Sequence, residues 1–241
     1  MNDTASILVV DDNVDIGINM SDILADMGYD TDVATNGSSA LKLIESKTYD
    51  VALLDFKMPD MDGATLYERI KTLQPDLVAI MITAYAGSNG VNRAKSAGTW
   101  RVLGKPVDIG SLLNLIDVVL KTPLVLVVDD DTDFCLTLWD LLREQHYRVG
   151  IAHSEQEAQQ RLQARHYDVV LLDLKLKDDD AGDRVFQFLQ HSDAIARTIL
   201  MTGYRTEMQD AIDKLLQNGA SCVYYKPLEL DALLARLREL V

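Results

Sequence analysis

The 241-residue sequence is poor in cysteine and contains no long apolar run. Its two cysteines, Cys135 and Cys222, do not have the spacing of a zinc site, so we expect reduced thiols in a cytoplasmic protein. No stretch approaches the roughly 20 consecutive apolar residues that a membrane-spanning helix needs, and the N-terminus has no signal-peptide pattern. We therefore expect no insertion into a membrane.

Basic residues are also in short supply. The chain has 23 lysines and arginines against 38 aspartates and glutamates, which gives a formal net charge of −15. A nucleic-acid-binding surface requires clustered basic side chains that neutralise phosphates, and the sequence contains no such cluster. We therefore expect no nucleic-acid partner. Part of the acidic excess can have a function, because pockets of carboxylates bind hard cations.

What the chain does contain is one pattern that occurs twice. An apolar run ends in Asp55 and another ends in Asp173, and these two aspartates are 118 positions apart. Three further landmarks recur in the same order and at nearly the same spacing. Asp11-Asp12 in the first half corresponds to Asp129-Asp130 in the second. In the same way Met81–Tyr85 corresponds to Leu200–Tyr204, and Lys105-Pro106 corresponds to Lys226-Pro227. A period of this length indicates two whole domains rather than a solenoid.

Within each half, apolar runs alternate with amphipathic segments. Ile7–Val10 is typical of a parallel strand that is buried on both faces, and the apolar residues after it recur at helical spacing. Five such units per half predict an α/β fold with two doubly wound five-stranded parallel sheets, each with (βα)5 topology and strand order 2-1-3-4-5. The predicted strands are 7–10, 31–34, 50–54, 77–82, 100–103, 124–128, 148–151, 168–172, 198–201 and 222–225. The predicted helices are 16–27, 40–46, 64–73, 88–97, 108–121, 133–145, 155–165, 183–191, 206–217 and 229–240.

The two domains are predicted to span residues 1–121 and 124–241, joined by a short linker at 122–123. Lys121-Thr122-Pro123 is too short and too stiff to act as a long flexible tether. We therefore expect a restricted arrangement of the two domains.

The aspartates are expected to meet at one edge of each sheet. The first and third strands are neighbours in this order, so Asp11, Asp12 and Asp55 form one acidic pocket at their carboxyl ends. Three carboxylates this close repel one another unless they are protonated or bridged by a cation, and oxygen ligands at a phosphate-handling site favour Mg²⁺. Asp55 can then accept a phosphoryl group as an aspartyl phosphate. Thr83 and Lys105, at the ends of two further strands, are placed to hold the transferred oxygens.

Both halves resemble the receiver domain of two-component response regulators, and the resemblance covers nearly the whole chain. It implies phosphorelay signalling with Mg²⁺ as cofactor, and a histidine kinase or histidine phosphotransfer protein as the phosphoryl donor. The resemblance implies that Asp55 and Asp173 are the phosphoacceptors. It implies that Thr83 and Thr202 carry the switch hydroxyls, and that Lys105 and Lys226 are the lysines paired with the acceptors. The implied metal ligands are Asp11, Asp12, Asp55 and the Lys57 backbone carbonyl, and Asp129, Asp130, Asp173 and the Lys175 backbone carbonyl. The resemblance also implies cis Lys-Pro bonds, and a switching surface on the fourth helix, fifth strand and fifth helix that serves for partner contacts or homodimerisation.

Three positions depart from the family pattern. Val102 and Val223 occupy the place of the usual switch aromatic, which puts the coupling between threonine and aromatic side chain in doubt. The Met58–Gly63 loop becomes the longer, proline-free Leu176–Gly182 in the second half, where Asp178–Asp180 is interpreted as a solvated acidic loop. The bulky pairs Lys57 with Tyr85 and Lys175 with Tyr204 predict slow self-dephosphorylation, because long side chains obstruct an attacking water.

Some of the same residues also occur in other protein families. A haloacid-dehalogenase-like phosphatase also uses an aspartate nucleophile, Mg²⁺ and lysine, but needs a second aspartate where this chain has Lys57 or Lys175. A nucleotide-binding Rossmann domain needs a glycine-rich turn where Asp11 and Asp12 stand. His146, His153, His166 and His191 lie at expected turns or helix ends, so they are interpreted as surface residues rather than phosphorylated ones. We expect a phosphoryl-accepting regulatory module and not an enzyme; the alternative is the N-terminal regulatory part of a larger hybrid histidine kinase or diguanylate cyclase.

Overall fold

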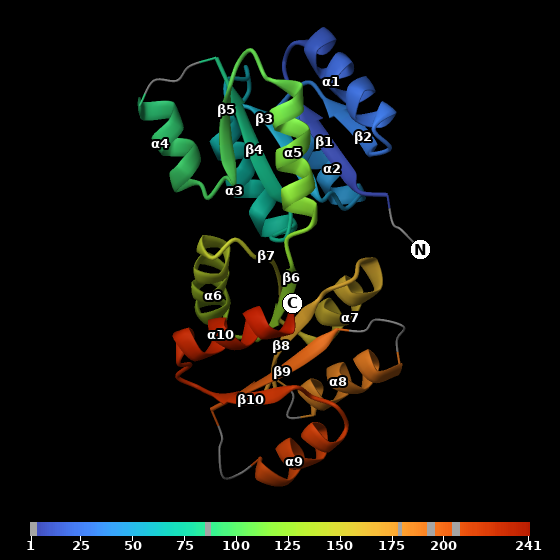
Figure 1. Ribbon diagram of the computed structural model, residues 1–241, viewed down its shortest axis with the longest axis vertical. Helices are drawn as coiled ribbons and strands as arrows, with labels where there is room; N and C mark the ends of the chain where they lie inside the picture. Colours follow the sequence, from blue (N-terminus) through green and yellow to red (C-terminus); the bar gives the residue numbers. More distant parts are fainter. Residues whose placement is uncertain (1–3, 85–87, 178–179, 192–195, 204–207) are drawn as a thin grey trace. The chain divides into compact units, whose positions relative to one another are not determined.

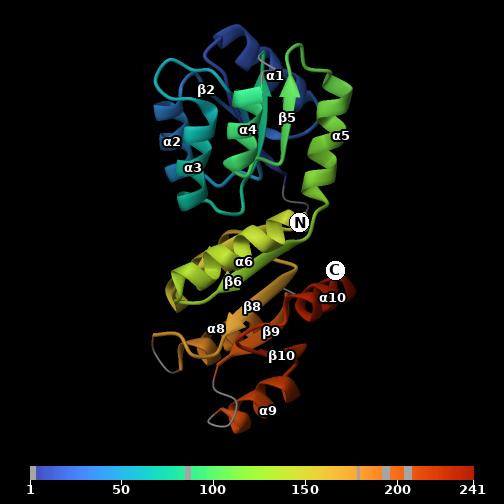
Figure 2. The ribbon, with the colours of Figure 1, turned by 90° about the vertical axis from the view of Figure 1, so that its left-hand side faces the viewer.

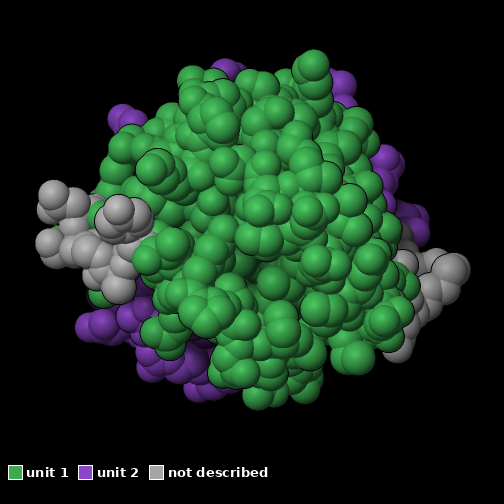
Figure 3. All heavy atoms as spheres, turned by 90° about the horizontal axis from the view of Figure 1, so that it is seen from above, with its two compact units in different colours: residues 1–121 green, residues 122–241 purple. Residues whose placement is uncertain are grey.

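The structure is a computed structural model, and it describes residues 4–84, 88–177, 180–191, 196–203 and 208–241. The chain divides into two compact units, residues 1–121 and 122–241 (Figure 3). Each unit contains one five-stranded sheet in which all pairs of neighbouring strands are parallel. The predicted fold class and strand order are therefore confirmed.

The first unit alternates strands and helices from end to end. Its elements are β1 (Ser6–Val10), α1 (Val14–Asp26), β2 (Asp30–Ala34), α2 (Gly37–Ser46), β3 (Val51–Asp55), α3 (Gly63–Leu73), β4 (Val78–Thr83), α4 (Ser88–Ser96), β5 (Arg101–Gly104) and α5 (Ile109–Leu120). The sheet order is β2-β1-β3-β4-β5. Helices α1 and α5 cover one face of this sheet and α2, α3 and α4 cover the other (Figures 1 and 2).

The second unit repeats this arrangement. Its elements are β6 (Leu124–Val128), α6 (Thr132–Glu144), β7 (Arg148–Ala152), α7 (Glu155–Ala164), β8 (Val169–Asp173), α8 (Ala181–His191), β9 (Arg197–Thr202), α9 (Gln209–Gln217), β10 (Cys222–Tyr225) and α10 (Leu230–Leu240). The sheet order β10-β9-β8-β6-β7 is the order of the first unit read from the opposite edge. One face packs on α6 and α10, and the other packs on α7, α8 and α9.

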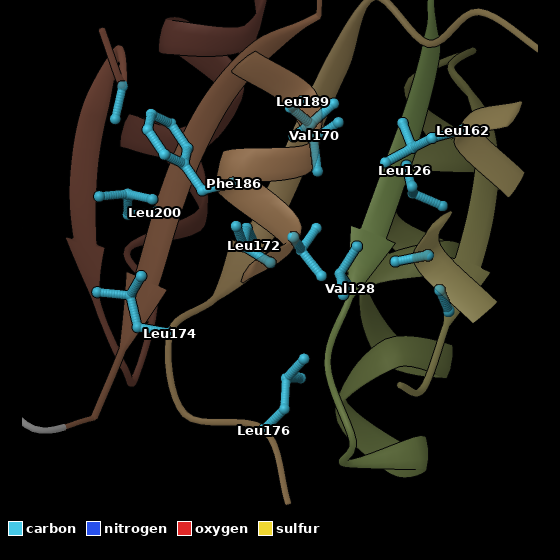
Figure 4. Packing of buried hydrophobic residues seen from close by; sticks show 14 of the residues in the cluster. Leu126, Val128, Leu162, Val170, Leu172, Leu174, Leu176, Phe186, Leu189 and Leu200 are labelled. Atoms are coloured by element: carbon cyan, nitrogen blue, oxygen red, sulfur yellow. The ribbon is translucent and has the colours of Figure 1, made fainter. Parts of the chain in front are cut away.

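The central strands are apolar throughout because both of their faces are covered. Successive side chains point to opposite faces, so Leu8 and Val10 of β1 join one core cluster and Ile7 and Val9 join the other. The same alternation holds in the second unit, and Figure 4 shows one of its two clusters, in which side chains of neighbouring strands pack with those of α7 and α8. The labelled members are Leu126, Val128, Leu162, Val170, Leu172, Leu174, Leu176, Phe186, Leu189 and Leu200.

Caps decide where several helices begin, and they correct some predicted bounds. The predicted helix starts at residue 40, but the Asn36 side chain accepts a hydrogen bond from the Ser39 N–H at 2.8 Å, so α2 begins at Gly37. Asn13 and Asp131 likewise cap α1 and α6, which begin earlier than predicted. The predicted start of α9 at residue 206 lies outside the described residues. In the part of the chain that is described, none of the helices is both long and apolar enough to span a membrane.

Candidate functional site

The pairing of β1 with β3 brings three carboxylates together in the first unit. Asp55 ends β3, and Asp11 and Asp12 follow β1, whose residue Val10 pairs with Leu54. One ligand oxygen from each of the three carboxylates lies within 4.8 Å of the others. Asp11 and Asp55 are only 4% and 7% exposed, whereas Asp12 faces solvent. The predicted acidic pocket is thus assembled at the carboxyl edge of the sheet.

Lys105 enters this pocket from the loop after β5. Its Nζ lies 2.7 Å from Asp11 Oδ2 and 3.2 Å from Asp55 Oδ1. Burial raises the pKa of Asp55, and the charges of Asp11 and Asp12 raise it further, while Lys105 opposes both effects. Burial acts to lower the pKa of Lys105, but contacts with Asp11 and Asp55 outweigh it, so this pKa is raised. The lysine therefore remains a cation among the carboxylates.

The second unit builds the same cluster from Asp129, Asp130 and Asp173, whose ligand oxygens also lie within 4.8 Å of one another. Lys226 Nζ lies 2.5 Å from Asp129 Oδ2 and 2.5 Å from Asp173 Oδ2. Asp129 is fully buried, and this burial raises its pKa against the opposing effect of Lys226. The ring of Phe134 lies on the lysine, with Nζ 4.4 Å from the ring centroid.

Backbone amides fix the orientation of the buried aspartates. The Asn13 N–H donates to Asp11 Oδ1 at 2.9 Å, which leaves Oδ2 for the lysine. The Asp131 N–H donates to Asp129 Oδ1 at 3.0 Å in the same way. Each first aspartate therefore has one oxygen held by the start of the following helix and one held by the lysine.

The threonines end the strands that neighbour the acceptor strands. Thr83 ends β4 and is buried, as is Thr202 at the end of β9. The backbone N–H of Lys105 donates to the Thr83 carbonyl at 2.8 Å, and that of Lys226 donates to the Thr202 carbonyl at 2.9 Å. Both Lys-Pro peptide bonds are cis, as the resemblance implies. The predicted threonine and lysine thus lie side by side at the edge where the acceptor strand ends.

The loop after each acceptor depends on a glycine that the sequence pattern alone did not single out. A Cβ on Gly63 would lie 2.5 Å from the backbone carbonyl oxygen of Asp55, and one on Gly182 would lie 2.7 Å from that of Asp173. Only a residue without a side chain lets α3 and α8 approach the acceptor backbone this closely. The recurrence of glycine eight or nine positions after each acceptor was the available signal. Lys57 and Lys175 lie inside these loops, and their carbonyls stay predicted metal ligands.

The structure describes some of the positions that depart from the family pattern, and it corrects the interpretation of one histidine. Val102 and Val223 are half-buried and pack against the cores, so aliphatic side chains fill the position of the usual aromatic. Tyr85, Tyr204 and residues 178–179 lie outside the described residues. The interpretation of the histidines as surface residues is wrong for His153, which is half-buried with Nδ1 3.1 Å from the backbone carbonyl oxygen of Asp129. This contact forms because β7 is the neighbour of β6.

Comparison with known proteins identifies the family of the two units. The family model for the response regulator receiver domain matches residues 7–117 and 125–238. The chain is 32% identical over 176 residues to a response regulator receiver protein of Anaeromyxobacter sp. (strain Fw109-5), covering 73% of this chain and 74% of that one. It is 34% identical over 106 residues to sporulation initiation phosphotransferase F of Bacillus subtilis (strain 168), covering 44% and 86%. A solved CheY-like receiver domain from Methanospirillum hungatei JF-1 has 34% identity and a TM-score of 0.46, covering 47% and 91%.

The two matches together span most of the chain, so the protein belongs to the response regulator receiver domain family, with two copies in tandem. Receiver domains are regulatory modules of two-component phosphorelays that accept phosphoryl groups, and they are not conventional enzymes. An aspartyl phosphate and a Mg²⁺ ion bound at an acidic pocket are general features of this family, and the carboxylate clusters of both units are consistent with them.

Proposed function

We propose that the protein is a tandem phosphoryl acceptor in which Asp55 and Asp173 each receive a phosphoryl group from a phosphohistidine of a histidine kinase or histidine phosphotransfer protein. The observation that carries this proposal is the repeated pairing of an acceptor aspartate with a half-buried lysine inside a carboxylate cluster. A phosphorylated unit then changes its contacts with a partner or with the other unit, because the charge and hydrogen bonds at the sheet edge have changed.

The donor atoms in each pocket fit a hard divalent cation. Three carboxylates face a single ammonium group in each cluster, so the pocket has an excess of negative charge and offers only oxygen ligands. Asp11, Asp12 and Asp55 with the Lys57 carbonyl would hold Mg²⁺ in the first unit, as would Asp129, Asp130 and Asp173 with the Lys175 carbonyl in the second. When bound, the ion supplies the charge that lets an anionic phosphoryl group approach a carboxylate.

The side chains of the chain then carry out the transfer. A carboxylate oxygen of Asp55 attacks phosphorus, the P–N bond of the phosphohistidine breaks, and its electron pair returns to the imidazole ring. Lys105 exchanges its contact with Asp55 for one with a transferred oxygen, and the Thr83 hydroxyl donates to another. Asp173, Lys226 and Thr202 have the same roles in the second unit.

Intact-mass measurement tests both acceptors at once. The parent, Asp55→Asn, Asp173→Asn and the double variant are incubated with Mg²⁺ and acetyl phosphate. We expect two added phosphoryl groups on the parent, one on each single variant and none on the double variant. A parent that binds Mg²⁺ but gains no mass would overturn the proposal, and one group on the parent would restrict it to a single unit.

The lifetime of the phosphorylated state is a second quantity to measure. Lys57 is exposed and Lys175 is half-buried, two residues after the respective acceptors. We propose that these long side chains slow hydrolysis by obstructing an attacking water. Lys57→Ala and Lys175→Ala are expected to shorten the half-life of the phosphoryl group on their own unit in donor-free buffer. Equal half-lives in parent and variants would contradict this role.

We propose the surface formed by α4, β5 and α5 as the contact that responds to phosphorylation, including self-association. Val118 on α5 supports this surface, since 56% of this apolar residue is exposed. Sedimentation velocity of the phosphorylated and free protein tests the proposal, and identical sedimentation over a range of concentrations would contradict self-association. We also propose that the protein acts in the cytoplasm, where reducing conditions suit its two free cysteines.

A further inference from the structure

The two lysines have different apolar neighbours besides their aspartates. Ile16 is the third residue of α1 and Phe134 is the third residue of α6, and each lies five positions after the first aspartate of its pocket. The two positions are therefore equivalent in the repeat. In the first unit Ile16 lines an apolar cavity of about 480 Å³, whose wall also includes Met20, Lys105 and Pro106. In the second unit the ring of Phe134 lies over Lys226.

The aromatic ring changes the forces on the lysine. A cation over the face of a benzene ring is attracted by the negative charge of that face, and the attraction is larger where water is excluded. Lys226 is held from two directions, by the ring at 4.4 Å and by Asp129 and Asp173 at 2.5 Å each. The equivalent lysine of the first unit has contacts of 2.7 and 3.2 Å with its two aspartates.

We propose that Phe134 is a positioning residue for Lys226: its ring holds the ammonium group against the acceptor Asp173 before the phosphoryl group arrives. This inference rests on the proposed phosphorylation of Asp173. A lysine already placed beside the acceptor loses less freedom when it pairs with the transferred oxygens, so the transfer is faster. Ile16 offers Lys105 an apolar neighbour with no such attraction.

The test isolates the second unit within the 241-residue chain. All proteins carry Asp55→Asn, so that mass added from acetyl phosphate and Mg²⁺ reports on Asp173 alone. In this reaction a carboxylate oxygen of Asp173 bonds to phosphorus, the bridging P–O bond of acetyl phosphate breaks, and acetate leaves with the electron pair. Phe134→Leu removes the ring, Phe134→Tyr keeps it, and Leu136→Ala changes an exposed apolar residue of the same helix as a control.

We expect Phe134→Leu to lower the rate constant of phosphorylation by about 2- to 30-fold, the range that corresponds to the loss of one cation–π contact. Phe134→Tyr should restore the rate to within about twofold of the parent, because tyrosine presents a similar ring face. A variant that only disturbed packing would not be rescued in this way. Equal rates for Phe134→Leu and the parent, or equally slow rates for the leucine and tyrosine variants, would overturn the inference.

Nuclear magnetic resonance gives a second readout that needs neither donor nor Mg²⁺. The methylene protons next to Nζ of Lys226 should be shifted upfield by the ring in the parent and in Phe134→Tyr, and the shift should be lost in Phe134→Leu. An unshifted parent resonance would overturn the inference whatever the rates are. A parent that shows the shift but takes up no phosphoryl group would instead contradict the proposed function of the second unit, and the inference with it.

The reciprocal variant uses the cavity of the first unit. With Asp173→Asn throughout, Ile16→Phe places a ring beside Lys105, where the cavity has room for it. We expect an upfield shift of the Lys105 resonance and faster phosphorylation of Asp55. A shifted resonance with an unchanged rate would show that the ring contacts the lysine without assisting transfer, and would overturn the inference.

Discussion

The two units contain the same charged groups in different apolar surroundings. In the first unit Lys105 lies beside a cavity of about 480 Å³, and in the second Lys226 lies under an aromatic ring. Each lysine nevertheless contacts both its acceptor aspartate and the aspartate that directly follows the first strand of its unit, which is Asp11 or Asp129. The charged residues of the pocket are thus the same in both units, while the apolar residues around the lysine differ. We infer that these apolar neighbours adjust the mobility of the lysine.

The loops after the acceptors differ in a similar way. In the first unit Asp60 accepts hydrogen bonds from the Gly37 N–H at 3.1 Å and from the Ser38 N–H and hydroxyl at 2.9 Å each, which anchors the loop to the start of α2. In the second unit Leu176 is buried in the core and anchors the loop by an apolar contact. The first loop is therefore held both by polar groups and by burial of Met58, and the second is held by burial of Leu176.

The largest effect is expected from removing each lysine. Without Mg²⁺, Lys226→Met should lower the free energy of unfolding of its unit by about 3 kcal/mol, because it leaves buried carboxylates without their cation. Lys105→Met should have a smaller effect, since Asp129 is fully buried and Asp11 is slightly exposed. Hydrogen exchange of the β8 and β3 amides measures the two units separately. Lys121→Met, which removes an exposed pair with Asp117, is the control and should have little effect. Equal losses in the two units would contradict the comparison.

A smaller effect is expected where the helices approach the acceptor backbone. Gly182→Ala and Gly63→Ala should each cost about 1–3 kcal/mol of stability through overpacking. Gly182→Ala should be the worse of the two, because its Cβ would meet three backbone atoms, whereas the Cβ of Gly63 would meet one carbonyl group and the adaptable Met81 side chain. Urea unfolding followed by hydrogen exchange measures both. Gly104→Ala and Gly203→Ala are the controls, since an added Cβ there meets nothing within 4 Å. The opposite order of the two losses would break the comparison.

The polar anchor of the first unit should show itself as a pH dependence. Desolvation acts to raise the pKa of Asp60, but hydrogen bonds from Ser38, Gly37 and Met61 outweigh this effect and lower the pKa to about 2. Because the folded pKa is below the ordinary value, this contribution is fully present above about pH 4 and is lost as the pH falls toward about 2. Asp60→Ala should therefore cost about 0.5–1 kcal/mol near neutral pH, as for the loss of a helix cap, and progressively less below about pH 4. Urea unfolding at several pH values checks this. Ser38→Ala, which leaves the carboxylate and the backbone donors in place, should keep the pH dependence, and a loss from Asp60→Ala that does not vary with pH would contradict the assignment.

The smallest effect concerns reactivity rather than stability. Both cysteines are in the second unit, so a thiol reagent reports on that unit alone. Burial, and to a lesser degree the charge of Asp129, raises the pKa of Cys135 to about 12, and its thiol donates to the Asp129 carbonyl at 3.3 Å. Cys222 should react first and Cys135 only when the start of α6 opens. Cys135→Ser and Cys222→Ser assign the two phases by mass, and faster reaction at Cys135 would contradict a closed pocket.

Much of this arrangement follows from the sequence because a few residues are tied to strand ends. Asp11 and Asp55 each follow a continuous apolar run, and the order of parallel strands then places them at one edge. The repeat supplies independent support, since Asp129 and Asp173 must satisfy the same geometry. The threonines and lysines were predictable for the same reason, as they end the remaining strands of each sheet.

The residues that the sequence did not reveal act through contacts between elements that are distant along the chain. Asp60 bonds to residues more than 20 positions away, and neither its type nor its spacing indicates this partner. Phe134 has the helical spacing of an ordinary core residue, and only the folded structure shows that its ring also covers a cation. His153 contacts the backbone carbonyl of Asp129 because β7 pairs with β6, which depends on the register of the two strands.

The long reach of the lysines has a consequence for synthesis on the ribosome. Lys105 and Asp11 are 94 positions apart in the sequence, and Lys226 and Asp129 are 97 positions apart. Each ion pair therefore joins segments near the two ends of its unit. The three carboxylates of a pocket are therefore made well before the lysine that balances them. Such distant contacts form late, because closing a long loop has to precede them. Each nascent unit thus lacks the lysine of its acidic edge until its last strand emerges, and soluble cations can balance the charge of the carboxylates until then.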